Sequence, residues 1–537
     1  MGRCYILRNS MNQYNPSTKI FEFINYAVVA FCVYFFSWLF VYKIGLNTLS
    51  IQSEDTLPAL IMPVTIIKEG TLYADSFYKE LLSRYPHPDD KDYSKGMVPF
   101  YFKKITTSET YSVKFPESLI YLVDPSDNQA ISIQKLTSHY ISAFPIVAGL
   151  MSLPIYAVPL SLGHPVTWEN LILWSHISSA LIVAISVGFF YLLVRYGFDV
   201  STRESELLTY IYGFGTINFA LVSQSLWQHG VVQLFLILSL IFVQQIPRSA
   251  NKYINLFLCG LFLSFAVLSR PTAALAIPFL LILIIEKLNG LNYDHFTNFR
   301  PQSLFLLLKG IVVPILIFVI SFVPTLVFFY IYNALYFVDI SNQGYASQLT
   351  SGWLTPFPNG FLGLWLSPSK GILVYSPIFI FSLLSVYFIS KIGGYKKNLW
   401  ALVFLAIVLL HTVILGMWKH WYGGWSFGYR MASDVIPFLT LLLIPAVKSP
   451  KFYLFKPLFN VVVIFSILVQ LYGMVFFDGI WHSAYDKGYK DTSWLWSFGD
   501  SEFAFNIRRV MVKLQILERA CPQCSPISLL EAPKISE

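Results

Sequence analysis

Apolar stretches of membrane-crossing length recur along the chain, separated by short polar connections. A helix of about twenty apolar residues crosses the ~30 Å hydrocarbon layer of a bilayer, so this pattern predicts an all-α polytopic membrane protein. We expect about eleven transmembrane helices. They lie at residues 21–42, 171–194, 207–222, 231–243, 254–268, 273–285, 311–332, 372–389, 399–417, 435–447 and 458–477.

The first apolar stretch is followed by a long polar segment and then by a semi-apolar stretch at 140–162. Prolines recur in and just beyond that stretch too closely for an undisturbed spanning helix, so we expect it to lie at the membrane interface. The predicted organisation then has five parts. They are a cytoplasmic N-terminus (1–20), a first transmembrane anchor (21–42), a large non-cytoplasmic loop with interfacial helices (43–170), a transmembrane helical bundle (171–477) and a non-cytoplasmic C-terminal tail (478–537).

The distribution of basic residues sets the predicted orientation. With the N-terminus in the cytoplasm, the short inner connections carry thirteen Lys and Arg residues, and the short outer connections carry four. Insertion into membranes imposes this asymmetry. If residues 140–162 crossed the bilayer, every later connection would change sides and the bias would reverse. The count therefore favours an interfacial position for that stretch.

Composition excludes two broad classes of protein. Of the 537 residues, 55% are hydrophobic and only 12% are charged, about half the charged fraction of a soluble domain. The net charge of +8 resides in the short inner connections, because residues 43–135 hold ten basic against twelve acidic residues. The sequence therefore predicts no nucleic-acid partner. It also contains no P-loop lysine motif. Cys521 and Cys524 form either a local disulfide or two free thiols.

An acidic motif, Ser-Glu-Asp-Thr at residues 53–56, follows the first span closely. A carboxylate at this position, Asp55, could take a proton from an incoming hydroxyl group at the mouth of a membrane cavity. The alternative is an acid that caps the start of a helix.

A second motif runs from Trp418 to Arg430 and interleaves glycines with aromatic residues. Glycines let a backbone approach a ligand closely, and the flat faces of Trp421 and Trp425 suit sugar rings. Arg430 offers a planar fork for a phosphate, and Asp434 follows it. The alternative is an interfacial belt of aromatic residues, which does not require the glycines or the arginine.

Three further polar groups lie at expected outer ends of spans: His229 in Trp-Gln-His-Gly, Arg270 in Ser-Arg-Pro-Thr, and Lys370 in Ser-Pro-Ser-Lys-Gly. Charged groups near membrane depth commonly mark a site. Each of the two cations could meet a phosphate or could reach lipid headgroups.

Taken together, these motifs resemble the membrane-embedded C-type glycosyltransferases (the GT-C superfamily), which include protein O-mannosyltransferases and bacterial aminoarabinose transferases of lipid A. The resemblance lies in the acid after span one, the Trp-Gln-His and Arg-Pro-Thr elements, and the late Trp-x-Gly-Gly-x-Ser-x-Gly-x-Arg element, residues 421–430. It implies a GT-C-like fold in a cell membrane, here a bacterial inner membrane.

The resemblance also implies a reaction and roles for the motif residues. A sugar would pass from a polyprenyl-phosphate donor to an acceptor hydroxyl, with inversion. Its acceptor would be a glycan, lipid or protein. We expect Asp55 to act as general base. The resemblance implies no definite cofactor. A divalent metal is left open, with Asp75 as its one candidate ligand. The expected phosphate ligands are Arg270, Lys370 and Arg430, and the expected sugar or acceptor contacts are His229, Trp421, Trp425 and Asp434.

Two other functions fit the same architecture. A transporter or flippase of lipid-linked sugars would be expected to place its polar groups near the bilayer midplane, between related halves. An envelope assembly protein would bind a lipid-linked glycan without turning it over. The polar groups here gather at outer span ends and no internal repeat is visible, so the sequence favours chemistry at the outer interface.

Overall fold

The structure is a computed structural model of the chain. It describes residues 16–45, 51–87, 89–92, 94–113, 131–289, 312–337, 351–392, 394, 398–513 and 516–517. Within these ranges, nine helices are long and apolar enough to cross a membrane. They are Pro16–Lys43, Trp168–Gly197, Gln228–Gln245, Lys252–Ser269, Pro271–Leu288, Val312–Tyr336, Leu399–Gly416, Arg430–Lys448 and Phe452–Phe476. The prediction of a helical, multi-pass membrane protein is confirmed.

One expected span, residues 207–222, is not a continuous helix. Helix α6 (Thr202–Phe214) ends before Gly215, and a short helix α7 (Ile217–Ala220) and a 3-10 turn η4 (Val222–Gln224) follow. The break has a local cause, because the Thr216 side chain accepts a hydrogen bond from the Asn218 amide and so caps a new helix.

A second expected span, residues 372–389, is also broken. It consists of α16 (Ile372–Tyr375), η7 (Pro377–Phe379), α17 (Ile380–Leu383) and α18 (Ser385–Ile389). Pro377 has no amide hydrogen and disfavours a helical conformation at Ser376, and the Ser376 backbone is accordingly non-helical (φ −141°, ψ 70°). Composition predicted the apolar character of both segments but not these interruptions.

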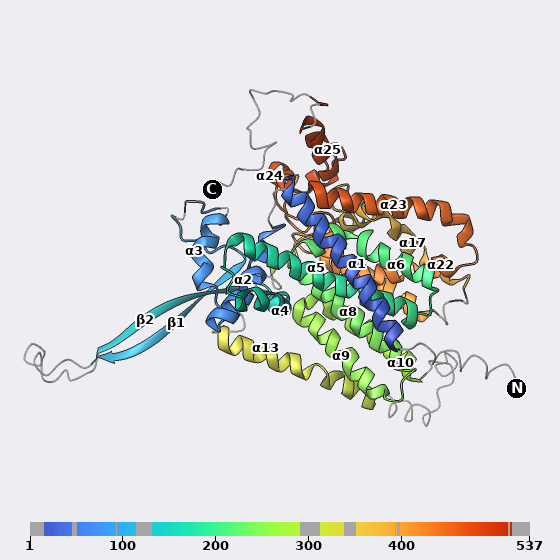
Figure 1. Ribbon diagram of the computed structural model, residues 1–537, viewed down its shortest axis with the longest axis horizontal. Helices are drawn as coiled ribbons and strands as arrows, with labels where there is room; N and C mark the ends of the chain where they lie inside the picture. Colours follow the sequence, from blue (N-terminus) through green and yellow to red (C-terminus); the bar gives the residue numbers. More distant parts are fainter. Residues whose placement is uncertain are drawn as a thin grey trace, which may run out of the picture.

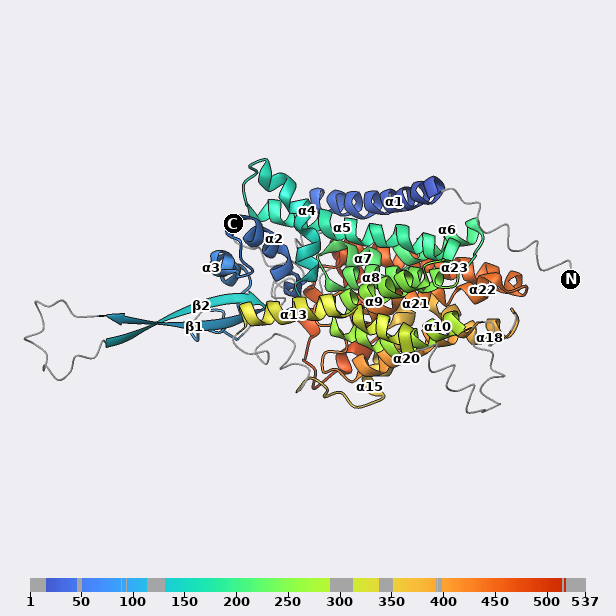
Figure 2. The ribbon, with the colours of Figure 1, turned by 90° about the horizontal axis from the view of Figure 1, so that it is seen from below.

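The long helices pack side by side into one bundle (Figures 1 and 2). The first helix, α1 (Pro16–Lys43), lies along α5 (Trp168–Leu192), and α8 (Gln228–Gln245) lies along α9 (Lys252–Ser269). Large apolar side chains remain exposed on α1, on α13 (Val323–Tyr336) and on α23 (Phe452–Phe476), as expected of surfaces that contact lipid. The remaining bundle helices are α10 (Ile277–Asn289), α20 (Leu399–Gly416), α21 (Ile436–Leu441) and α22 (Ile444–Lys448).

The segment after α1 forms a separate layer at the far end of the bundle. It contains α2 (Leu57–Glu69), α3 (Asp75–Arg84) and α4 (Val147–Ser161), and α4 has 15 residues and two internal prolines. A long antiparallel hairpin, β1 (Phe102–Val113) with β2 (Ile131–Ser142), projects away from the helices (Figures 1 and 2). The sequence analysis did not predict these strands.

The chain after α23 folds back over the same end. Helix α24 (Ile480–Tyr485), the turn η9 (Ser493–Trp496) and helix α25 (Glu502–Lys513) follow one another there. A cluster of buried rings joins them to α15 (Asn359–Leu366) and to the aromatic–glycine motif; its members include Trp421, Tyr422, Trp481 and Trp494. Cys521 and Cys524 lie outside the described residues.

Candidate functional site

The structure brings Asp55 and Arg430 together from opposite ends of the chain. Asp55 lies in the short turn η1 (Glu54–Thr56), and Arg430 opens the turn η8 (Arg430–Val435). The Arg430 Nη1 atom donates to Asp55 Oδ2 at 2.5 Å. The Arg430 side chain is 13% exposed and the Asp55 side chain is 24% exposed. The pair is therefore partly accessible from outside the protein.

Asp55 does not cap a helix. The cap of η1 is Ser53, whose hydroxyl accepts the Asp55 amide hydrogen at 3.4 Å. The side chain of Thr56, which precedes α2, makes no capping hydrogen bond. The Asp55 carboxylate is therefore directed to Arg430, and the capping alternative raised from the sequence does not account for it.

Arg430 retains hydrogen-bonding capacity beyond its bond to Asp55. Its guanidinium lies 4.8 Å from the ring centroid of Trp227, a cation–π arrangement. Its Nε atom is buried and has no partner among the described residues. Gly423 passes close by with φ +83°, and a Cβ atom built there would lie 3.2 Å from Arg430 Cβ. A glycine is favoured at this position, because other residues rarely adopt that φ.

A second polar cluster surrounds Asp434 in the interior. His229 Nδ1 lies 2.7 Å from Asp434 Oδ1, Arg270 Nη1 donates to Oδ2 at 2.8 Å, and the Thr272 hydroxyl donates to Oδ2 at 3.3 Å. His411 Nε2 lies 3.5 Å from the same oxygen. His229 Nδ1 also lies 2.8 Å from Arg270 Nη1, so the histidine contacts both members of the Arg270–Asp434 pair.

This cluster contains three of the residues that the sequence analysis assigned to substrate. His229, Arg270 and Asp434 are all buried, and they are bonded to one another. A phosphate that reached Arg270 would have to compete with Asp434 for the guanidinium. Their contacts in this structure join the start of α8, the end of α9 and the turn η8.

Lys370 is fully buried in a third cluster, formed with the C-terminal segment. Its Nζ atom donates to the Ser426 carbonyl and to His482 Nε2 at 3.0 Å, and it lies 3.8 Å from Glu502 Oε2. Burial lowers the Lys370 pKa to about 8, an effect that Glu502 opposes. Burial also raises the Glu502 pKa above its usual value, and it holds the His482 pKa well below its usual range.

Glu502 and His482 are functional-site neighbours that the sequence analysis missed. Glu502 follows Lys370 by 132 residues and lies in α25, within the segment predicted as a tail. An acid at the start of an amphipathic helix gives no sequence signal of a buried ion pair. The one usable signal is the aromatic content of residues 481–496, which is unusual for a solvated tail.

The two candidate sugar-binding tryptophans have opposite environments. Trp421 is 1% exposed, and its ring fills the space over Gly363, where an added Cβ would lie 2.2 Å from the ring. Trp425 is 50% exposed and lies near His482. In this conformation, Trp425 is the one of the two whose ring is open to a ligand.

Asp75, the candidate metal ligand, is hydrogen-bonded to strand β2 of the hairpin. Its carboxylate contacts His139 Nδ1 at 2.6 Å and accepts the Tyr140 amide hydrogen at 2.8 Å, both from β2. Within the part of the chain that the structure describes, no group of three or more His, Cys, Asp or Glu side chains is arranged to hold a metal ion.

Glu54 lies beside Asp55 and differs from it in environment. Burial, aided by the charge of Asp55, raises the Glu54 pKa to about 7. A carboxyl group whose pKa lies near neutral pH therefore adjoins Asp55, a feature often found at sites that move protons. Comparisons with protein-family models and with curated proteins gave no match for this chain.

Proposed function

We propose that the protein is a membrane glycosyltransferase that moves a sugar from a polyprenyl-phosphate donor to an acceptor hydroxyl at the outer face of the membrane. The observation that carries the proposal is the Asp55–Arg430 pair. It joins a carboxylate to a guanidinium that has an unpartnered donor, at the end of a bundle built to sit in lipid.

The charges around this pair favour a phosphate. Arg430 is the most accessible of the three cations assigned to the phosphate, since Arg270 is bonded to Asp434 and Lys370 is enclosed. Arg430 would therefore contact a phosphate directly, through its planar fork of donors. Lys370 would add positive electrostatic potential at the phosphate from its buried position, because charges act over longer distances in a poorly solvated interior.

The proposed step breaks the bond between the anomeric carbon and the phosphate oxygen, and the acceptor oxygen forms a new bond to that carbon on the opposite face. Asp55 takes the acceptor proton, and Arg430 neutralises the charge that develops on the leaving polyprenyl phosphate. Because Arg430 binds Asp55 in the unliganded protein, a phosphate that attracts Arg430 would also release the carboxylate to act as a base.

The direct test uses purified protein in lipid nanodiscs or vesicles with a radiolabelled polyprenyl-phosphate sugar. Transfer to a hydroxyl acceptor supports the proposal, whereas flux into vesicles without product supports a transporter, and bare binding supports an assembly protein.

Arg430→Ala should weaken donor binding by about 1–3 kcal/mol, the range for a charge-assisted hydrogen bond. Arg430→Lys should recover part of that loss, because a point charge lacks the fork. Arg248→Ala is the matched control, since Arg248 also pairs with an aspartate, Asp199 at 2.9 Å, on an inner connection. Normal donor binding by Arg430→Ala would place the phosphate elsewhere.

A further inference from the structure

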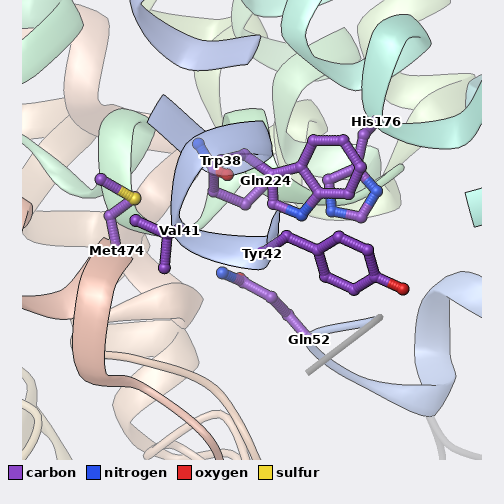
Figure 3. Close-up of a pocket in the computed structure, with 7 residues that line it drawn as sticks. All are labelled: Trp38, Val41, Tyr42, Gln52, His176, Gln224 and Met474. Carbon is purple, nitrogen blue, oxygen red and sulfur yellow. The ribbon is translucent and has the colours of Figure 1, made fainter. Parts of the chain in front are cut away.

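A small pocket opens beside the outer end of α1, apart from the Asp55–Arg430 pair. Seven residues line it: Trp38, Val41, Tyr42, Gln52, His176, Gln224 and Met474. The rings of Trp38, Tyr42 and His176 gather on one side, and Val41 and Met474 lie opposite them (Figure 3). These residues come from α1, α5, η4 and α23 and from the segment that leads to η1.

The hydrogen-bond roles of three lining side chains are fixed by backbone carbonyls, which can only accept. Gln52 Nε2 donates to the Ala220 carbonyl at 2.8 Å, and Gln224 Nε2 donates to the Phe219 carbonyl at 3.0 Å. His176 Nδ1 donates to the Ile172 carbonyl at 2.9 Å. The atoms left over are therefore Gln52 Oε1, Gln224 Oε1 and His176 Nε2.

These leftover atoms are acceptors without a hydrogen-bond partner in the described part of the chain. Gln52 Oε1 is moreover buried, so its lone pairs lack both water and protein donors. Histidine that donates through Nδ1 presents a lone pair at Nε2 when it is neutral. The pocket thus offers three acceptors, and the Trp38 ring nitrogen and the Tyr42 hydroxyl are its potential donors.

The set of lining groups defines the class of ligand. None of the seven lining residues is Lys, Arg, Asp or Glu, so no formal charge offsets the desolvation of an ion. A phosphate or carboxylate would also face lone pairs. A hydroxylated neutral group would instead donate its O–H hydrogens to the acceptors. The Trp38 ring stacks on those of Tyr42 and His176, with centroids 5.5 and 3.9 Å apart, and the three rings give the pocket an aromatic wall beside its acceptors.

The pocket is built on the same two segments as the Asp55–Arg430 pair. Gln52 precedes Asp55 by three residues, and Gln224 precedes Trp227, which stacks on Arg430, by three residues. Between them, the Thr56 and Ser225 hydroxyls lie 3.4 Å apart and join the two segments. The segment that brings Gln52 to the pocket is therefore the same one that carries the proposed base.

We infer that this pocket receives one hydroxyl group of a neutral, polyhydroxylated ligand, the headgroup of a glycolipid or one end of a soluble glycan. This assignment rests on the proposed function, in which the pocket would belong to the acceptor site, because it lacks the charges that a donor phosphate requires. Its place at the outer end of α1, whose exposed face contacts lipid, lets a lipid-attached headgroup reach it from the bilayer.

The test is native mass spectrometry of the full chain in a detergent without a sugar headgroup. The probes are monoglucosyl diacylglycerol, maltose and phosphatidic acid, each without donor. We expect the glucolipid to bind and phosphatidic acid not to compete for its place. Maltose binding would identify a soluble glycan as a source, and its absence would leave the glycolipid; either result agrees with the inference.

Two variants address the pocket directly. Gln224→Met removes an acceptor, and Tyr42→Leu removes a ring face, and each should weaken glucolipid binding about 3- to 10-fold, the loss expected for one neutral hydrogen bond or stacking contact. Tyr330→Leu, on the exposed face of α13, is the matched control. If Gln224→Met fails to fold, Tyr42→Phe, which keeps the ring, replaces it and should lose less than Tyr42→Leu.

Unchanged glucolipid binding in the folded variants, or equal binding of phosphatidic acid at this place, would overturn the inference. Because binding is measured without donor, the result is separate from transfer. An active enzyme whose pocket variants bind normally would refute the pocket alone. A protein that binds the glucolipid through this pocket and transfers no sugar would refute the proposed function alone.

Discussion

Substitution of Asp55 by Asn tests whether this residue acts in catalysis or only stabilises the fold. Asn keeps the shape of the side chain, but it cannot take a proton from an acceptor hydroxyl. If Asp55 is the general base, the rate at saturating donor should fall on the order of 10²–10⁴-fold. Donor binding should not weaken, because Arg430 loses the carboxylate that competes with the phosphate. The loss of rate corresponds to roughly 3–5 kcal/mol on the activation barrier.

The structural cost of the same change is smaller. Asp55 and Arg430 are 24% and 13% exposed, so their pair falls between exposed pairs, worth about 0–1 kcal/mol, and buried ones, whose breakage costs about 3–5 kcal/mol. We expect a loss of about 1–2 kcal/mol in the free energy of unfolding. The effect on turnover should therefore exceed what destabilisation explains.

The assay measures turnover per folded molecule and thermal stability for the same preparation. Asp75→Asn is the matched control, because Asp75 is an outer acid in a similar contact, 2.6 Å from His139, away from the pair. A folded Asp55→Asn protein with normal turnover would refute the assignment. A purely structural pair predicts that Asp55→Asn combined with Arg430→Gln regains both stability and activity, whereas a base predicts regained stability alone.

Three other expectations follow from the same structure. Glu502→Gln should cost about 3 kcal/mol by leaving Lys370 buried without its counter-charge, and adding Lys370→Met should restore part of it in thermal unfolding. Glu54 has a pKa near 7 in the fold, above its unfolded value, so its contribution to stability is full at acid pH and is lost as pH rises from about 4.5 to 7. Glu54→Gln should therefore raise the unfolding free energy at pH 8 by about 3 kcal/mol and have much less effect at pH 4. Equal changes in unfolding free energy at the two pH values would contradict this expectation. Cysteines placed at exposed Lys490 and Lys451 should label from outside and inside respectively, and outside labelling at Lys451 would reverse the orientation.

Hydropathy predicted the membrane helices well because crossing a bilayer demands length and apolar composition, both visible in sequence. It did not locate the breaks at Thr216 and Pro377, which arise from local capping and from a missing amide hydrogen. The hairpin carried a recognisable signal. Residues 102–113 and 131–142 are rich in Thr, Ile and Tyr, which favour strands, but their polar character placed them in an undifferentiated loop.

The sequence motifs singled out the candidate residues, but they did not show which of them pair. Motif position singled out Asp55, Arg430, Arg270 and Asp434. Which cation meets which acid depends on how spans separated by 375 and 164 residues pack. The structure pairs Arg430 with Asp55 and Arg270 with Asp434, and so leaves Arg430 as the accessible cation.

The Arg270–Asp434 pair also constrains how the chain is made. Arg270 is synthesised 164 residues before Asp434, and a charged residue raises the cost of inserting its segment by up to about 3 kcal/mol at the bilayer centre. Until the span Arg430–Lys448 emerges from the ribosome, Arg270 has no carboxylate from that span to meet. The contact between Arg270 and Asp434 therefore forms only in the last fifth of synthesis. A chain that ended before that span would contain Arg270 without the Asp434 carboxylate.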